Sequence, residues 1–269
     1  MKRFAFIAIL LGIVVPIASL QAAEPIDVAF TANIDGSEQR YVILEPGGVD
    51  PSRSVSLLVA LHGHGSDRWQ FVRDARPECL AARSAAAKFG SIYVSPDYRA
   101  KTSWMGPAAE ADMVQILSEL KKRYRVEKVV VCGGSMGGTA ALTFAALHPE
   151  LVDGVVAMNG TANFVEYDQF LDAITASFGG SKQEKPEEYR KRSAELHADR
   201  LTMPIAVTTG GRDKLVPPDS VLRLAETLKK RGRPVLSIHR PEGGHDTNLA
   251  DATSAFDFVL NRVLAGKPR

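Results

Sequence analysis

Residues 126–148 read VEKVVVCGGSMGGTAALTFAALH, and this stretch decides how the rest of the chain folds. It contains Val129, Val130 and Val131, whose β-branched apolar side chains are typical of a strand buried on both faces of a parallel sheet. A glycine-rich turn follows, and the alanine-rich segment after the turn has helical propensity. The stretch therefore predicts a strand, a tight turn and a helix in direct succession.

The turn carries a serine between two glycines, in the pattern Gly133-x-Ser135-x-Gly137, and it is called the elbow below. This pattern is typical of a nucleophilic serine raised above a sheet on a strained turn, where side chains at the glycine positions would collide with neighbouring backbone. The helix after the turn directs free N–H groups, including that of Met136, at an oxyanion formed on a substrate. We interpret Ser135 as a nucleophile; the alternative is a serine without a role in a glycine-rich turn.

The composition is that of an ordinary globular protein with one domain. The chain has 269 residues, of which 45% are hydrophobic and 24% are charged, and its formal net charge is +2. A chain of this length buries a sizeable core in a single α/β domain. Its charge, close to zero, gives no reason to expect nucleic acid as a partner.

The two cysteines, Cys79 and Cys132, stand far apart in the sequence, and no H-E-x-x-H motif occurs. The sequence therefore predicts no zinc site, and we expect no cofactor. Export would permit a disulfide, but Cys132 ends the central strand, where a small buried thiol is the commoner outcome. We expect two free cysteines.

Residues 1–23 have the layout of a secretory signal peptide. A basic start is followed by an almost wholly apolar run over 4–20 and then by small residues up to Ala23. We expect a secreted or periplasmic protein that consists of residues 24–269 and has no stable membrane association after cleavage. Because the cleavage site is imperfect and the apolar run approaches the length of a membrane span, an uncleaved anchor is the alternative.

Strand and helix patterns alternate along the rest of the chain. Apolar segments predict strands at 28–30, 41–44, 55–61, 91–96, 154–158, 205–209 and 235–238, and helical patterns cover 78–89, 107–124, 218–231 and 249–264. This alternation predicts an α/β fold with a mostly parallel sheet and helices on both faces. Residues 161–203 have no strand pattern; helical segments at 163–178 and 186–201 predict a small cap inserted over the carboxyl ends of the strands, where ligands bind in such sheets.

A serine hydroxyl is a poor nucleophile until a base takes its proton, and the base needs a carboxylate to orient it. His245 is the best placed of the six histidines, because it lies in a glycine-flanked loop after the last expected strand. Asp213 follows another expected strand within the segment GGRDKLVP, whereas Asp246 is a rival acid next to the histidine. The chain order Ser135, Asp213, His245 is the order that the α/β-hydrolase fold uses.

With these residues in place, the chain resembles the α/β-hydrolases over about residues 40–264. The segments G-G-R-D-x-x-V-P at Asp213 and G-G-H at His245 match the acid and histidine loops of that family. The segment His62-Gly63-His64-Gly65 corresponds to the H-G-x-G motif of the family. By this resemblance the backbone N–H of His64 joins that of Met136 as an oxyanion donor, and His62 is a structural histidine that holds the loop.

Within the family, the chain is most similar to secreted esterases of the feruloyl esterase and polyhydroxybutyrate depolymerase type, and it also resembles the catalytic domains of prolyl oligopeptidase-type enzymes. The similarity rests on the elbow, residues 95–99 (SPDYR), Ser103-Trp104 and Asp112. It implies a serine hydrolase that cleaves carboxylic esters of small molecules, carbohydrates or polymers through an acyl-enzyme on Ser135. No propeller sequence precedes the domain, which disfavours a peptidase.

Several alternatives remain open. A peptidase, a thioesterase or a lactonase would use the same residues on the same fold, and a catalytically silent binding protein is the alternative from outside the enzymes. Four residues that follow expected strands are predicted to border the substrate pocket: Trp104, Asn159, Thr161 and Asn163. Trp104 is interpreted either as a stacking platform for a sugar or aromatic group or as a packing residue. The acyl group, the alcohol group and the oligomeric state are not predicted.

Overall fold

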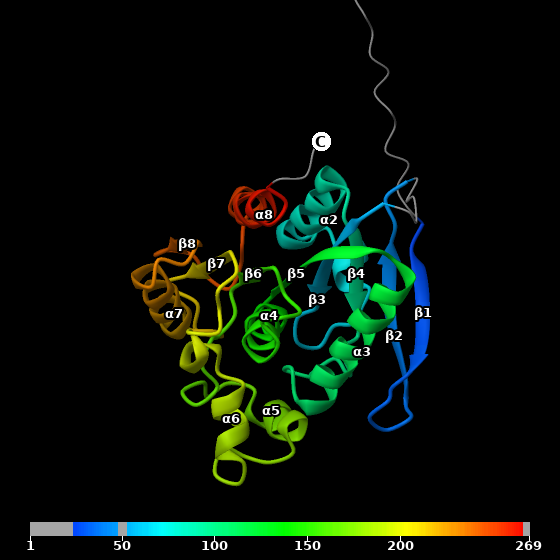
Figure 1. Cartoon of the computed structure of the whole chain (residues 1–269). Helices are drawn as coiled ribbons and strands as arrows, with labels where there is room; N and C mark the ends of the chain where they lie inside the picture. The colour runs from blue at the N-terminus through cyan, green and yellow to red at the C-terminus, as the bar shows by residue number, and fades with distance from the viewer. Residues whose placement is uncertain (1–23, 48–52, 266–269) are drawn as a thin grey trace, which may run out of the picture.

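The protein is described by a computed structural model that covers residues 24–47 and 53–265. Its strands are β1 (Ile26–Thr31), β2 (Glu38–Leu44), β3 (Val55–Leu61), β4 (Ile92–Pro96), β5 (Val126–Gly134), β6 (Gly154–Met158), β7 (Ile205–Gly210) and β8 (Val235–Arg240). They form one sheet of eight strands in the order β1-β2-β4-β3-β5-β6-β7-β8 (Figure 1). β2 is antiparallel to both β1 and β4, and the strands from β4 to β8 in this order are mutually parallel.

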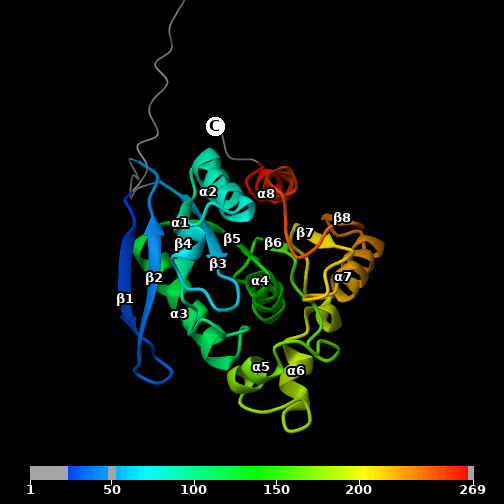
Figure 2. The same cartoon turned by 180° about the vertical axis from the view of Figure 1, so that it is seen from behind.

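Helices cover both faces of the sheet (Figures 1 and 2). They are α1 (Gln70–Arg73), α2 (Pro77–Phe89), α3 (Pro107–Arg123), α4 (Met136–Leu147), α5 (Leu171–Phe178), α6 (Pro186–Lys191), α7 (Asp219–Lys230) and α8 (Leu249–Val263), with a 3₁₀ turn at Ala194–His197. In β5, Val129 and Val131 pack on one side with α3, α4 and α7, whereas Val130 and Cys132 pack on the other side with α1, α2 and α8. This two-sided burial is why the strand reads as a continuous apolar run.

These elements confirm the predicted fold class, a mostly parallel α/β sheet covered on both faces. Residues 159–204, all of them described, hold no strand and contribute α5, α6 and the 3₁₀ turn (Figure 1). The helical segment predicted over 186–201 is divided between α6 and the 3₁₀ turn.

The helix predicted over 163–178 is wrong in its first half, because α5 begins only at Leu171. Residues 163–170 instead fold back onto the domain. The Phe164 N–H, for example, donates to the Ser193 hydroxyl at 2.9 Å. Tertiary hydrogen bonds of this kind replace the bonds that a helix would have made within itself.

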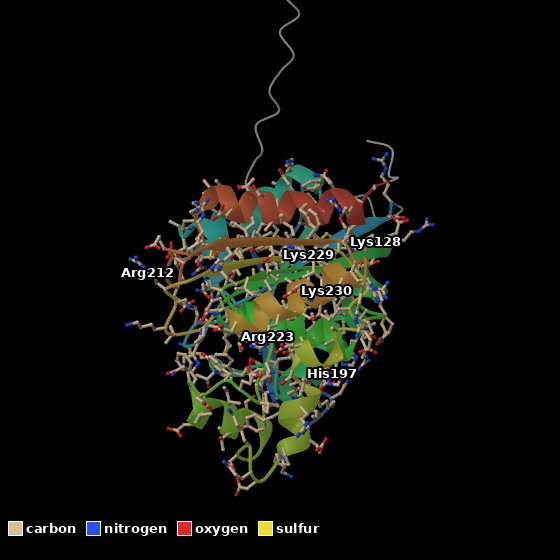
Figure 3. All side chains as sticks on the ribbon, turned by 90° about the vertical axis from the view of Figure 1, so that its left-hand side faces the viewer. Lys128, His197, Arg212, Arg223, Lys229 and Lys230 are labelled. Atoms are coloured by element: carbon tan, nitrogen blue, oxygen red, sulfur yellow. The ribbon has the colours of Figure 1, made fainter. Side chains whose placement is uncertain are left out.

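An arginine on α7 connects the segment between β6 and β7 to that helix by hydrogen bonds. Arg223 donates to the carboxylates of Glu195 and Glu166, both of which belong to this segment. Figure 3 shows Arg223 on α7 and His197 in the 3₁₀ turn beneath it. Residues 159–204 are thus held against the body of the domain on the side of α3, α4 and α7.

Both cysteines are free and buried, as predicted. Burial raises the pKa of the Cys79 thiol to about 12 and that of Cys132 well above its ordinary value. Such thiols stay protonated at neutral pH and pack as small apolar groups. The predicted signal peptide, residues 1–23, lies outside the described residues. Within 24–47 and 53–265, no helix combines the length and the apolar character needed to cross a membrane.

Candidate active site

Ser135 stands between the end of β5 and the start of α4, with φ 57° and ψ −122°. A positive φ is strained for a serine, and it persists because the surroundings hold it: the Ser135 N–H donates to the Met158 carbonyl at 2.8 Å. The glycine requirement is clear at Gly137, where a Cβ atom would lie 2.0 Å from the Leu61 carbonyl oxygen. Strand β3, strand β5 and helix α4 therefore meet at a distance that only glycine permits.

The structure brings Ser135, His245 and Asp213 into one hydrogen-bonded chain. The Ser135 hydroxyl lies 2.9 Å from His245 Nε2, and His245 Nδ1 lies 2.6 Å from Asp213 Oδ2. With the Nδ1 proton directed at the carboxylate, Nε2 is left as the acceptor for the serine proton. His245 is 110 positions from Ser135 and 32 from Asp213 in the sequence, and the structure pairs it with Asp213 and not with its neighbour Asp246.

The Asp213 carboxylate is almost completely buried, with 1% of its side chain exposed against 26% for His245. Its second oxygen, Oδ1, accepts the N–H groups of Leu215 at 3.0 Å and Val216 at 2.9 Å. Its charge is therefore compensated by two backbone donors in addition to the imidazole. The acid is fixed in place and keeps one oxygen directed at the histidine.

A buried polar network holds the loop that carries His245, and the sequence did not predict it. Thr247 donates a short hydrogen bond to the Asn159 side chain, and its hydroxyl lies 2.7 Å from that of Thr208. Asn159 itself adopts φ 50°, and its N–H donates to the Thr208 carbonyl at 2.9 Å. The network joins the ends of β6 and β7 to the histidine loop and so sets the height of His245 above the sheet.

The loop after β3 is held through its first histidine. His62 is buried, with Nδ1 2.9 Å from the Gly63 carbonyl and Nε2 3.1 Å from the Asp97 carbonyl. Burial lowers the pKa of His62. The Gly63 N–H donates to the Gln70 side chain at 2.7 Å. His62 thus occupies an internal position, where it contacts the loop backbone.

The two N–H groups expected to bind an oxyanion are those of Met136 and His64. Met136 is the first residue of α4, and the first N–H groups of a helix have no acceptor within it. Within the described part of the chain, the His64 N–H donates to no other group. Both groups are therefore available to an external acceptor.

The composition of the site gives no sign of a metal centre. Within 24–47 and 53–265, no cluster of three or more His, Cys, Asp or Glu side chains could hold a metal ion. The groups brought together here are a hydroxyl, an imidazole, a carboxylate and backbone N–H donors, a set that is suited to nucleophilic catalysis.

A small hollow of about 60 Å³ lies beside Ser135. All four residues predicted to border the pocket are buried; of these, Asn159 lines this hollow, and Trp104, Thr161 and Asn163 do not. Residues 161–170 fold back onto the domain, so their side chains are engaged elsewhere. The Thr161 hydroxyl pairs with that of Ser220, and the Asn163 amide donates to Glu195. The lining is formed by Gly63, Gln70, Phe71, Arg76, Glu78, Gly134, Ser135, Met158, Asn159, His245, Asp246 and Thr247.

The model of the prolyl oligopeptidase family matches residues 86–262 of this chain. Among curated proteins, dipeptidyl aminopeptidase BIII of Pseudoxanthomonas mexicana is 22% identical over 148 residues. The alignment covers 52% of this chain and 22% of that protein. The chain thus spans about a fifth of the length of the curated relatives that it matches.

Two solved structures match the chain over nearly their whole length. FphF, a fluorophosphonate-binding serine hydrolase of Staphylococcus aureus, has a TM-score of 0.66 at 16% identity, covering 90% of this chain and 99% of that one. A ferulic acid esterase has a TM-score of 0.67 at 19% identity, covering 89% and 97%. At this level of identity the two structures establish the α/β-hydrolase fold, which the resemblance in the sequence predicted.

Proposed function

The chain belongs to the prolyl oligopeptidase family of serine hydrolases, and from this premise we propose that it cleaves carboxylic esters through an acyl-enzyme formed on Ser135. The observation that carries the proposal is the chain of hydrogen bonds from Ser135 Oγ to His245, at 2.9 Å, and from His245 to Asp213, at 2.6 Å. A hydroxyl, an imidazole and a buried carboxylate in this arrangement form the unit that activates a serine.

The reaction follows from the positions of the protons. His245 Nε2 takes the hydroxyl proton while Ser135 Oγ attacks the ester carbonyl carbon, and Asp213 stabilises the imidazolium that results. The N–H groups of Met136 and His64 bind the negative oxygen of the tetrahedral intermediate. When the intermediate collapses, His245 gives its proton to the departing alcohol. A water molecule, activated by the same histidine, then releases the acid from Ser135.

One observation favours an ester over a peptide. The hollow beside Ser135 is small, at about 60 Å³, which suits a short group better than a peptide side chain of ordinary size. A ferulic acid esterase with the same fold illustrates that this scaffold can carry an esterase activity.

A peptidase is the second candidate. The prolyl oligopeptidase family and the dipeptidyl aminopeptidase relative support it. The same three residues would then cleave an amide, whose nitrogen must be protonated by His245 before it leaves.

A panel of substrates separates these candidates. We expect p-nitrophenyl acetate and butyrate and acetylated sugars to give higher kcat/KM values than dipeptidyl and aminoacyl anilides. Feruloyl esters complete the panel, because their larger acyl group tests the size of the hollow. Ser135→Ala should lower kcat on the best substrate by about 10⁴-fold or more, because the remaining rate comes from oxyanion donors and binding alone. Higher kcat/KM on the anilides would favour the peptidase, and an active Ser135→Ala protein would exclude the acyl-enzyme.

A further inference from the structure

Trp104 contacts the two residues whose backbone N–H groups we assign to the oxyanion. Its indole Nε1 donates to His64 Nδ1 at 3.1 Å, and its backbone N–H donates to the Met136 sulfur at 3.5 Å. We propose that Trp104 is a positioning residue for the oxyanion site, which fixes the His64 ring and thereby the His64 N–H relative to Met136. This inference rests on the proposed function, because it assumes that the two N–H groups act on a substrate oxygen.

The hydrogen bond to His64 determines where the imidazole carries its proton. An indole N–H is only a donor, so His64 Nδ1 must be the acceptor and the ring must be neutral, with its proton on Nε2. Burial lowers the pKa of His64, which keeps the ring in this form at neutral pH. Trp104 therefore selects one tautomer and one orientation of the His64 side chain.

Aromatic packing closes the remaining freedom of the His64 ring. Its centroid lies 4.4 Å from that of Phe170 and 5.8 Å from that of Trp104, and the Phe170 and Trp104 centroids are 5.4 Å apart. Phe170 belongs to the segment between β6 and β7, which folds back onto His64 and Trp104. Each of the three rings therefore contacts the other two, and together they hold the loop after β3 from the side of that segment.

The backbone at Trp104 indicates that this arrangement is maintained against a conformational cost. Trp104 and Met105 adopt φ 44° and 57°, and Phe170 adopts φ 55°. Positive φ values are costly in residues other than glycine, and they persist where the surroundings over-determine them. Trp104 is fully buried and contacts Phe164 and Tyr167 as well, so its indole has no freedom to turn away from His64.

The consequence for catalysis is selective. A misplaced N–H weakens the interaction with the tetrahedral intermediate more than that with the ground-state ester, because the negative charge develops only in the transition state. A displacement of about 1 Å costs up to 10²-fold in rate. Losing the Trp104 hydrogen bond should therefore lower kcat and leave KM nearly unchanged.

The test uses Trp104→Phe, which keeps an aromatic ring and removes the N–H. We expect kcat on p-nitrophenyl acetate to fall by about 10- to 100-fold, with KM changed by less than about threefold. The affinity for a small alkylboronic acid, which forms a tetrahedral adduct on a serine hydroxyl, should weaken by a similar factor. Trp69→Phe is the matched control, because Trp69 stacks on Arg73 outside the lining of the hollow, and it should keep wild-type kcat.

A second pair of variants keeps the inference falsifiable if Trp104→Phe does not fold. His64→Leu keeps the backbone N–H and removes the acceptor, and should reproduce the loss in kcat. His64→Gln offers a side-chain oxygen to the indole, and should recover most of it. If the two residues act as one unit, Trp104→Phe/His64→Leu loses no more than the larger single loss.

Wild-type kcat in folded Trp104→Phe or in His64→Leu, or a double variant that loses the product of the two single losses, would overturn the positioning role. These outcomes are distinct from failure of the proposed function. An active Ser135→Ala protein would refute the acyl-enzyme whatever Trp104 does. An inactive Ser135→Ala protein beside a fully active Trp104→Phe protein would refute the inference alone.

Discussion

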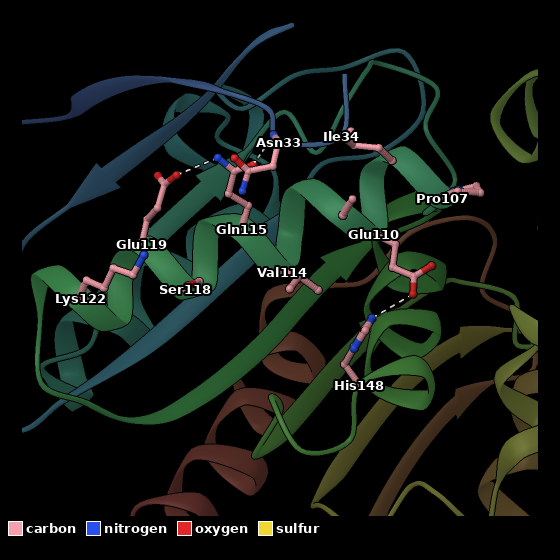
Figure 4. Close-up of a pocket in the computed structure, with 11 residues that line it drawn as sticks. Asn33, Ile34, Pro107, Glu110, Val114, Gln115, Ser118, Glu119, Lys122 and His148 are labelled. Carbon is pink, nitrogen blue, oxygen red and sulfur yellow. Dashed lines mark hydrogen bonds and ion pairs between the residues drawn. The ribbon is translucent and has the colours of Figure 1, made fainter. Parts of the chain in front are cut away.

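Two of the cavities formed by residues 24–47 and 53–265 differ greatly in size. A groove of about 670 Å³ runs along α3 between the turn that joins β1 to β2 and His148 (Figure 4). The hollow beside Ser135 measures only about 60 Å³. By volume alone, the groove would be the default choice for a binding site.

The hydrogen bonds of the polar groups favour the small hollow as the functional site instead. In the groove, the buried and partly buried polar groups have partners: Gln115 binds Glu119 and the Thr31 carbonyl, and Glu110 binds His148 (Figure 4). At the hollow, Ser135 is hydrogen-bonded to a histidine that can take its proton. Two N–H groups assigned to the oxyanion also have no acceptor among the described residues.

Backbone strain separates the two cavities in the same way. Among the described residues, no non-glycine residue with a positive φ lines the groove. The non-glycine residues with a positive φ instead follow β4, β5 and β6 or contact the loop after β3. Strained backbone is concentrated where function requires a fixed geometry. In this molecule, hydrogen-bonded reactive groups and strained backbone mark the hollow beside Ser135, whereas cavity volume alone would mark the groove. The non-glycine residues with a positive φ are Tyr98, Arg99, Trp104, Met105, Ser135, Asn159 and Phe170.

The largest expected effect tests the acid at the small hollow. Asp213→Asn keeps the shape but presents an amide to His245 and favours the wrong tautomer, so kcat should fall by about 10⁴-fold. Asp246→Asn is the control, and its kcat should change by less than about tenfold, because the structure pairs His245 with Asp213. Steady-state kinetics on one p-nitrophenyl ester measures both. A crippled Asp246→Asn protein beside a mild Asp213→Asn effect would show that the acid is Asp246.

The elbow and the proximity of Ser135, Asp213 and His245 could be predicted from the sequence, because local constraints define them. Gly137 must lack a side chain to let α4 approach β3, and a serine two positions before such a glycine, after a buried strand, is typical of a nucleophile. Asp213 and His245 each follow a strand, and parallel strands bring their carboxyl ends to one edge. Their order in the chain then indicated the fold.

The surroundings of the site were not predictable in the same way. The Asn159 and Thr247 side chains meet across 88 positions in the sequence, and neither has a local pattern that announces the contact. Trp104 was expected at the pocket because it follows a strand, but residues 163–170 fold back over it. That fold-back depends on tertiary hydrogen bonds such as the one from Phe164 to Ser193, which override the helical pattern.

A smaller effect should appear when the hollow is narrowed. A Cβ atom at Gly134 would lie 3.7 Å from Glu78 Cγ and 3.9 Å from Phe71 Cζ, which is ordinary contact, so Gly134→Ala should fold normally. If the hollow holds the acyl group, the ratio of kcat/KM for butyrate to that for acetate should fall by about 10-fold, because the added methyl group takes the space of about one methylene group of the longer acyl chain. Gly47→Ala, with no atom within 4 Å of the added carbon, is the control.

If Gly134→Ala leaves both kcat/KM values and their butyrate-to-acetate ratio unchanged, the hollow does not bind the acyl group. A uniform loss on both esters would instead assign the hollow to the alcohol group that they share.

The smallest expected effect on activity belongs to the large groove. Glu110 is partly buried there, and burial acts to raise its pKa. The hydrogen bond with His148 and the charge and hydrogen bond of Arg192 outweigh this effect, so that the pKa of Glu110 is lowered to about 2. A carboxyl with a folded-state pKa below its unfolded value of about 4.3 stabilises the fold above that value, and the contribution is lost as the pH falls towards the folded-state pKa. Glu110→Gln should therefore lower the free energy of unfolding by about 1–3 kcal/mol at pH 7, because Arg192 loses a charged partner.

Denaturant unfolding at pH 7 and pH 3 checks this prediction, and the difference between wild type and Glu110→Gln should shrink at the lower pH. Glu119→Gln is the matched control on the same helix, since its carboxylate binds the neutral Gln115 amide, and it should cost less than about 0.5 kcal/mol. Both variants should keep kcat/KM within about twofold of wild type, because the groups of the groove are engaged in holding α3, α4 and the segment between β6 and β7 together. A loss of more than about tenfold in kcat/KM with unchanged stability would make the groove part of the functional site and would break the distinction between the two cavities.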